Sequence, residues 1–159
     1  MIGRRNVRER GQGIVEFAVI FPIFAFLLFA VIDGGLVMGR YNNANQAAGV
    51  GARLAATNTP VSTVRSAIQD QMHGEMSGLT CDDSEDDVCI DFRTGPNGEA
   101  AGDVGSIVVV YVRYEYDLIT PIVGNATGGD WDIDACSVQR VERPISGSNL
   151  SFDQNVTEC

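Results

Sequence analysis

Glu16 is a single acidic residue inside an apolar stretch of the sequence. From Gly13 to Ile32 there are twenty residues, and all except Glu16 and Pro22 are apolar or glycine. Twenty residues at about 1.5 Å each can cross a hydrocarbon core of about 30 Å. A carboxylate in such a span costs roughly 2.5 to 3.5 kcal/mol at the centre and less near the end. We therefore expect Glu16 to have a partner or a function.

Four cysteines, Cys81, Cys89, Cys136 and Cys159, follow the predicted span. An even number of cysteines outside the reducing cytosol favours two disulfides. Spacing alone allows three connectivities, and we favour Cys81 with Cys89 and Cys136 with Cys159 because each pair brackets a short segment. A zinc site is the weaker alternative, since the only histidine, His73, is far from any cysteine pair of the usual spacing. We expect no metal and no other cofactor.

Other kinds of chemistry have little support in the sequence. One histidine, no GxSxG and no HExxH argue against an enzyme. The acidic run within 82–87 could attract calcium, but it lacks the glycine and glutamate positions of an EF-hand loop, so we expect a solvated loop. Asn-x-Ser/Thr triplets at Asn125, Asn149 and Asn155 would be glycosylated only in a secretory pathway that reads them.

The charges are strongly partitioned along the chain. Residues 1–13 contain four arginines against one glutamate, whereas residues 41–159 contain six arginines against eighteen acidic residues. The positive-inside bias predicts a cytoplasmic N-terminus and an acidic C-terminal part on the other side of the membrane. The acidic exterior has no basic patch, which argues against nucleic acid as a partner.

The helical pattern continues beyond the membrane, from about Gly13 to Ala56. Small residues then recur on one face of this predicted helix, and Gly35 with Gly39 forms a GxxxG at the outer end of the span. The small residues are Ala44, Ala48, Gly51 and Ala55. Such a face allows close approach, either of another helix or, as we slightly favour, of the chain's own globular domain.

The remaining sequence predicts one small α+β domain. A break at Thr57 to Pro60 precedes a second amphipathic helix over Val61 to Met76, with Ser62 as a cap. CDDSEDDVC reads as a charged loop, and the tail from Pro144 also reads as a loop. Alternating and continuous apolar positions predict two antiparallel strands, over Ile107 to Asp117 and Trp131 to Glu142.

The N-terminal segment does not fit an ordinary cleaved signal peptide, because its apolar run is too long and no A-x-A site follows closely. RGQGIVEFAVIFPIF instead resembles the start of the TadE-like pseudopilins of tight-adherence (Tad, or Flp) pilus systems. Those proteins begin with a basic leader, a glycine, four residues, and then glutamate followed by an aromatic. By this resemblance Gly11 ends the leader, Gln12 is the first mature residue, Glu16 the fifth and Phe17 the sixth.

This resemblance implies a leader at 1–11, a transmembrane and pilin-like helix at 12–57, and an extracytoplasmic α+β domain at 58–159. It also implies a minor pilin in the inner membrane, cut by a prepilin peptidase, with other pilins and the assembly platform as partners. Glu16 would then pair with the new amine of a neighbouring subunit. Entry into the fibre stays open. The alternative is a membrane-anchored acidic module that binds a partner through its outer domain.

Overall fold

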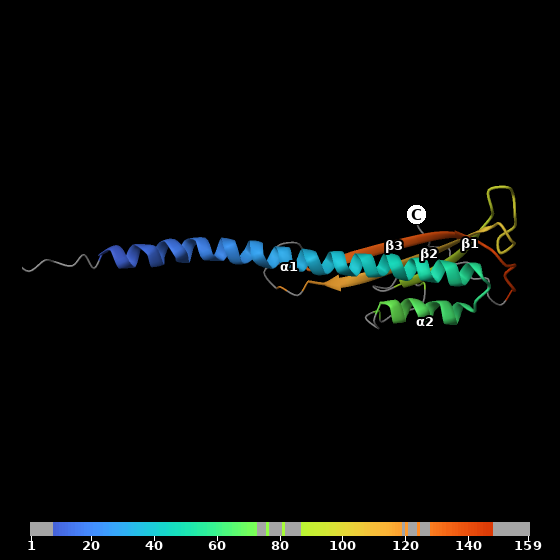
Figure 1. Cartoon of the computed structure of the whole chain (residues 1–159), viewed down its shortest axis with the longest axis horizontal. Helices are drawn as coiled ribbons and strands as arrows, with labels where there is room; N and C mark the ends of the chain where they lie inside the picture. The colour runs from blue at the N-terminus through green and yellow to red at the C-terminus, as the bar shows by residue number, and fades with distance from the viewer. Residues whose placement is uncertain are drawn as a thin grey trace, which may run out of the picture. The chain divides into compact units, whose positions relative to one another are not determined.

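The computed structural model of the chain describes residues 8–72, 76, 81, 87–118, 120, 124 and 128–147. Within these residues, two helices are followed by three strands (Figure 1). The three strands form one antiparallel sheet, which confirms the predicted α+β class. The elements are α1 (Arg8–Ala56), α2 (Val61–Gln71), β1 (Asp87–Arg93), β2 (Ile107–Asp117) and β3 (Asp130–Arg140).

The chain divides into two compact units, and α1 contributes to both. The first unit contains Met1–Leu36 and Asp117–Gly129. The second contains Val37–Tyr116 and Asp130–Cys159, and therefore includes α2 and almost all of the sheet. The part of α1 that follows Leu36 is thus an integral element of the α+β unit.

Helix α1 is continuous through Pro22 and contains the predicted membrane span. Among the described residues it is the one helix that is long and apolar enough to cross a membrane. Large apolar side chains along its first half are exposed, as lipid-facing side chains should be; they include Ile14, Phe17, Phe21, Phe24, Leu27 and Val31. The predicted helix from Gly13 to Ala56 is confirmed, and its N-terminal end extends back to Arg8.

Helix α1 ends in a Schellman motif centred on Asn58. The backbone N–H of Thr59 donates to the carbonyl of Leu54 at 3.3 Å, and that of Asn58 donates to Ala55 at 3.3 Å. Asn58 has a φ of 63°, the left-handed conformation that asparagine tolerates better than most residues. The predicted break after Ala56 therefore has a specific backbone cause.

Helix α2 is shorter than predicted, because it ends at Gln71 and not at Met76. The predicted range included Gly74, a residue that disfavours helix interiors. Ser62 is not the cap: Pro60 occupies the cap position, and its carbonyl accepts the N–H groups of Thr63 and Val64 at 2.9 and 3.0 Å. Proline there has no side-chain oxygen to accept a bond, so the backbone alone starts this helix.

Strand β1 was not predicted, because its first residues were assigned to the charged loop. It pairs with β2 in antiparallel register, with Val88 opposite Val112 and Ile90 opposite Val110. These side chains are fully buried, whereas Asp91 on the other face is partly exposed. Strand β2 confirms the predicted range, and β3 begins one residue earlier and ends two residues earlier than predicted.

Strands β2 and β3 begin their pairing at a bulge. The N–H of Gly105 donates to the carbonyl of Val141, and the N–H of Val141 donates to the carbonyl of Ser106, both at 2.9 Å. Gly105 has a φ of 94°, as the first residue of a G1 bulge requires. When the pairing of β2 with β3 continues from this bulge without another one, Arg113 lies opposite Asp134.

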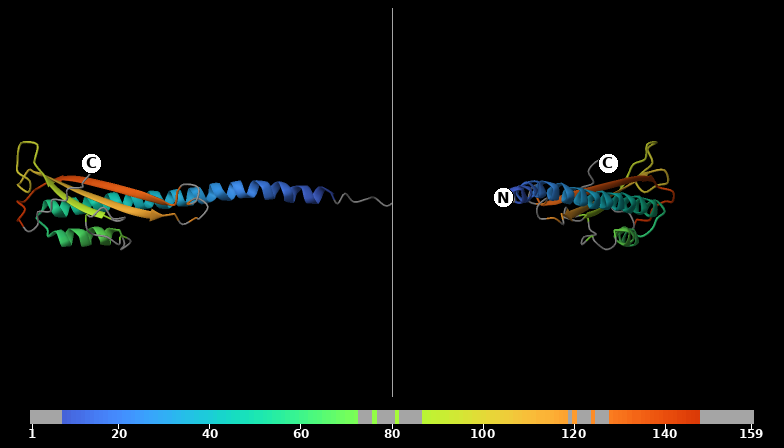
Figure 2. Two further views of the ribbon diagram at one scale, coloured as in Figure 1. Left: turned by 180° about the vertical axis from the view of Figure 1, so that it is seen from behind. Right: turned by 60° about the vertical axis from the view of Figure 1, so that its left-hand side comes forward.

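The core of the α+β unit lies where α1, α2 and β2 meet. All four residues of the predicted small stripe are buried, and so are Ala47 and Ala52. A Cβ added at Gly51 would lie 2.6 Å from Cδ1 of Ile68 in α2 and 3.3 Å from Cγ1 of Val110 in β2. Figure 2 shows α2 running back along the C-terminal part of α1. The stripe is therefore the docking face for the chain's own domain.

Candidate functional site

The residues of the predicted leader junction lie on α1. Gly11 and Gln12 fall within its bounds, and Glu16 is four residues beyond Gln12, which places positions 12 and 16 on one face of the helix. An amine formed at Gln12 would thus share a face with the Glu16 carboxylate.

Glu16 itself is exposed and surrounded by apolar side chains. It lies in a shallow depression that Val15, Val19 and Ile20 also line. Within the described part of the chain, the side chain of Glu16 makes no hydrogen bond or ion pair. A cationic partner would therefore have to come from another chain or from the residues near the N-terminus.

Phe17 follows Glu16 and is 65% exposed. Its ring lies 5.3 Å from that of Phe21, one turn further along the same helix. The two rings form an exposed aromatic pair beside the carboxylate. This arrangement offers one acidic group and an adjacent apolar surface, which together fit a second membrane helix that carries a positive charge.

Another carboxylate on α1, that of Asp33, is buried and was not assigned a role from the sequence. It is 1% exposed, and the hydroxyl of Thr120 donates a hydrogen bond to its Oδ2. Both residues belong to the first compact unit. The Oδ1 atom is buried without a hydrogen-bond partner among the described residues. The two residues are 87 positions apart, so no local sequence pattern could have predicted that they meet.

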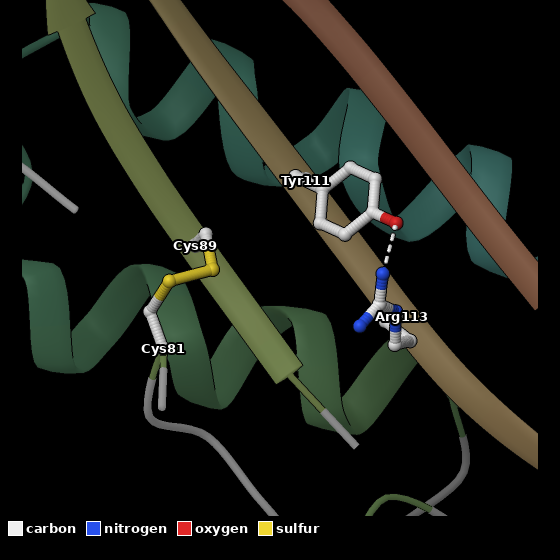
Figure 3. The surroundings of a disulfide bond; sticks show 4 residues. All are labelled: Cys81, Cys89, Tyr111 and Arg113. Carbon is white, nitrogen blue, oxygen red and sulfur yellow. Dashed lines mark hydrogen bonds between the residues drawn. A yellow bond between two sulfur atoms is a disulfide. The ribbon is translucent and has the colours of Figure 1, made fainter. Parts of the chain in front are cut away.

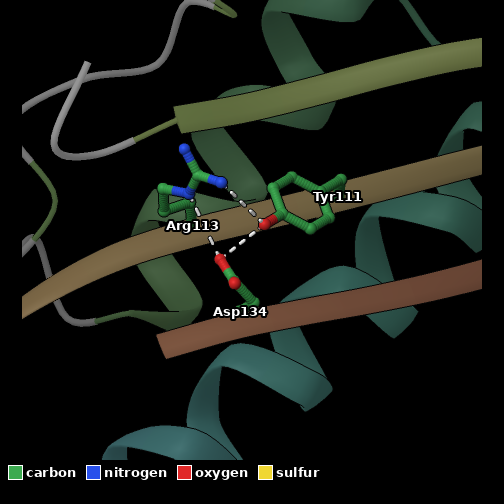
Figure 4. A network of polar contacts seen from close by, with 3 residues as sticks. All are labelled: Tyr111, Arg113 and Asp134. Atoms are coloured by element: carbon green, nitrogen blue, oxygen red, sulfur yellow. Dashed lines mark hydrogen bonds and ion pairs between the residues drawn. The ribbon is translucent and has the colours of Figure 1, made fainter. Parts of the chain in front are cut away.

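A polar network occupies the sheet face opposite the core (Figure 4). The Tyr111 hydroxyl donates to Oδ1 of Asp134 at 2.5 Å, and Nε of Arg113 lies 3.3 Å from the same oxygen. Nη2 of Arg113 also donates to the Tyr111 hydroxyl at 3.3 Å. The three groups satisfy one another across β2 and β3, which indicates a cross-strand brace.

The electrostatics of this network agree with a structural role. Partial burial raises the pKa of Tyr111 above its ordinary value, and the hydrogen bond to Asp134 raises it further. Hydrogen bonds to Tyr111 and Asp134 also raise the pKa of Arg113. Tyrosine stays protonated and arginine stays charged at neutral pH, so neither group is prepared to act as a base.

The disulfide between Cys81 and Cys89 has the pairing favoured from the sequence. Their Cα atoms are 4.8 Å apart, and Cys89 lies opposite Tyr111 in the β1–β2 register (Figure 3). Cys136 is also disulfide-bonded, but its predicted partner Cys159 lies outside the described residues. The bond at Cys89 fastens the start of the sheet to the segment that follows α2.

The other sequence candidates give no site in the described part of the chain. The described residues contain no group of three or more histidine, cysteine, aspartate or glutamate side chains that could hold a metal ion. The other candidates lie outside the described residues, either wholly or at their first residue: His73, the acidic run from Asp82 to Asp86, and the triplets at Asn125, Asn149 and Asn155.

A comparison with protein families supports the resemblance seen in the N-terminal sequence. Residues 11–53 match the family described as TadE-like protein. The match begins at Gly11, includes Glu16 and Phe17, and ends at Arg53, so that α2 and the sheet lie outside it. No significant match was found to a curated protein or to a solved structure.

Proposed function

We propose that this protein is a minor pilin that takes part in assembling a Tad/Flp pilus after a prepilin peptidase removes its leader. The observation that carries this proposal is the family match over residues 11–53, which starts at the predicted leader glycine and includes Glu16. The exposed, unpartnered state of Glu16 in the described structure supports it, because a carboxylate on an apolar helix needs an intermolecular reason.

The first step is hydrolysis of the peptide bond between Gly11 and Gln12. Water adds across this bond, so that a carboxylate is left on Gly11 and an amino group on Gln12. The amino group is protonated at neutral pH, since an α-amine has a pKa of about 7.7 to 8.0. Removal of the basic leader thus exchanges several arginine charges for one positive charge close to the apolar span.

The second step is docking of two subunits through Glu16. A lone carboxylate within a span costs roughly 2.5 to 3.5 kcal/mol at the centre and less toward an end. A lone ammonium group there is similarly unfavourable, and contact between the two charges relieves both. Association of the Glu16 of one chain with the Gln12 amine of the next is therefore favoured only after cleavage.

The protein would occupy the inner membrane as a single-pass subunit with its domain outside the cytoplasm. The arginines of residues 1–13 support this orientation, and so does the acidic composition after residue 41. The disulfide between Cys81 and Cys89 is also typical of an oxidising compartment. The other pilins and the assembly platform would be its partners, and the peptidase would act before them.

Two substitutions separate processing from assembly. Gly11→Val should leave an uncleaved precursor in the membrane, which intact mass or N-terminal sequencing would show. Gly34→Val is its matched control, because Gly34 is exposed on the same helix with nothing within 4 Å of an added Cβ. Recovery of a chain that begins at Met1 from the unaltered protein would refute the proposed maturation.

Glu16→Val should leave normal amounts of cleaved protein in the membrane but abolish its co-purification with other pilus components, and pili should be lost. Ile20→Val is the control, one turn along the same exposed face, and should assemble normally. If Glu16→Val assembled normally, the carboxylate would be tolerated and not used. The membrane-anchored binding module would then be the better explanation.

A further inference from the structure

The chain covers one carboxylate of α1 and leaves its neighbours exposed. Asp33 is 1% exposed, whereas Val31 is 74%, Ile32 is 48% and Leu36 is 39% exposed. The cover includes Thr120, whose hydroxyl donates to Asp33. Thr120 is thus held against the helix at a position where the helix carries a charged group.

The depth of this contact follows from the length of the span. Gly13 to Ile32 can cross a hydrocarbon core of about 30 Å, so Asp33 lies near its outer boundary. The next charged residue on the helix is Arg40, and the positions between them are apolar or glycine. Because Thr120 is bonded to Asp33, the loop around Thr120 lies at the same depth.

The composition of the loop suits a lipid environment. Residues 118–129 read LITPIVGNATGG and contain no charged side chain, although Asp117 and Asp130 stand on either side. This is an uncharged stretch in a chain with 21 acidic residues. Backbone hydrogen bonds within it join Gly124 to Thr120, and Gly128 to Gly124, at 3.0 Å each. Each of these bonds satisfies one backbone N–H and one carbonyl, which lowers the cost of placing those groups at an apolar boundary.

We propose that the loop around Leu118, Thr120 and Gly124 is a second membrane contact, which rests on the lipid at the outer end of the span and shields Asp33 from it. The apolar side chains of Val31 and Ile32 before Asp33, and of Leu36 after it, are exposed. This inference requires the membrane span but not the role in pilus assembly.

Tryptophan fluorescence tests the proposal on the full chain in phospholipid vesicles. Trp131 is the only tryptophan, so Trp131→Phe gives a silent background. Leu118→Trp then reports on the loop. Val104→Trp is the water-facing control, because Val104 is 55% exposed and belongs to the other compact unit. Phe24→Trp, at an exposed position in the middle of the span, is the lipid-facing control.

Two quenchers are applied to each variant: lipid brominated near the headgroup, and aqueous iodide. The Leu118→Trp variant should be quenched by the brominated lipid at least about twofold more than Val104→Trp, and by iodide less than Val104→Trp. Quenching by iodide alone would overturn the proposal, since the loop would face water. Quenching by neither reagent would also overturn it, because protein, such as a second copy of the chain, would then cover the loop.

Addition of Thr120→Val to the Leu118→Trp variant examines the link to Asp33. Valine keeps the shape of threonine but removes the hydroxyl donor. The headgroup quenching should fall and the iodide quenching should rise, because the loop would lose the bond that holds it at this depth. Equal quenching with and without Thr120→Val would show that the hydrogen bond does not position the loop, and would overturn that part of the proposal.

Discussion

Gly51→Ala should destabilise the α+β unit although alanine is the better helix former. Replacing glycine by alanine inside a helix gains about 1 kcal/mol. At Gly51, however, the new Cβ would lie 2.6 Å from Cδ1 and 3.0 Å from Cγ1 of Ile68. Carbon atoms normally pack at about 3.5 to 4.0 Å, so Ile68 would have to move by about 1 Å.

Ile68 has little room for that movement. It is fully buried, as is Val110, whose Cγ1 would itself lie 3.3 Å from the added Cβ. Overpacking of a filled core costs about 1 to 3 kcal/mol. After the helix-propensity gain is subtracted, we expect Gly51→Ala to lower the free energy of unfolding by about 0 to 2 kcal/mol.

A comparison of Gly51→Ala with Gly49→Ala tests whether the effect comes from close packing. Gly49 lies on the same helix with nothing within 4 Å of an added Cβ, so Gly49→Ala should raise the free energy of unfolding by up to about 1 kcal/mol. Ile68→Val removes Cδ1 and should recover part of the loss when combined with Gly51→Ala, although alone it costs about 0.5 to 1.5 kcal/mol.

Denaturant unfolding of the full chain in detergent, followed by the fluorescence of Trp131 in β3, measures all four variants. Equal stabilisation by Gly51→Ala and Gly49→Ala would refute the close packing of α1 against α2 and β2.

Three further predictions follow from the described unit. Serine at both Cys81 and Cys89 should lower the free energy of unfolding by about 2.5 kcal/mol in the loop-entropy model, and denaturant curves under oxidising conditions would measure it. Because folding raises the pKa of Tyr111, the protonated tyrosine stabilises the fold below a pH of about 10, and this stabilisation is lost as the pH rises through the pKa of the folded state. Asp134→Asn should lower the pKa of Tyr111, which a phenolate absorbance titration would measure. Gly39→Leu should not lower the free energy of unfolding, because an added Cβ there has nothing within 4 Å.

The long helix could be predicted because its signals are local. An uninterrupted apolar run sets the span, and the small residues at spacings of four and three place one face of the helix. The end at Ala56 was also predictable, since asparagine and proline follow it closely. What the spacing could not tell was which surface would cover the small residues, and the contact of Gly51 with Ile68 and Val110 gives the answer.

Strand β1 was not predicted because its sequence contains acidic residues, as the loop before it does. Asp87 and Asp91 continue the acidic run, and only the alternate residues are strongly apolar. The decisive interactions are the antiparallel pairs of Val88 and Ile90 with the centre of β2. A strand whose stabilisation comes from a partner about twenty residues later cannot be recognised from its own composition.

The pair of Asp33 and Thr120 was missed for a related reason. A threonine in a loop carries no sequence signal, and Asp33 was not assigned a role from the sequence. Only the folded chain brings them together, through the segment between β2 and β3. The Glu16 carboxylate stood out because it lies inside the apolar run, at its fourth residue, whereas Asp33 follows the end of the run.

The two sets of small residues on α1 now have different consequences. The stripe from Ala44 to Ala55 is filled by the chain's own domain, so it offers no surface to another chain while the unit is folded. Gly35 and Gly39 are exposed, and an added Cβ at either has nothing within 4 Å. Of the two sets, the one that remains open to a neighbouring helix is therefore Gly35 with Gly39, which precedes Arg40 as the exposed Glu16 does.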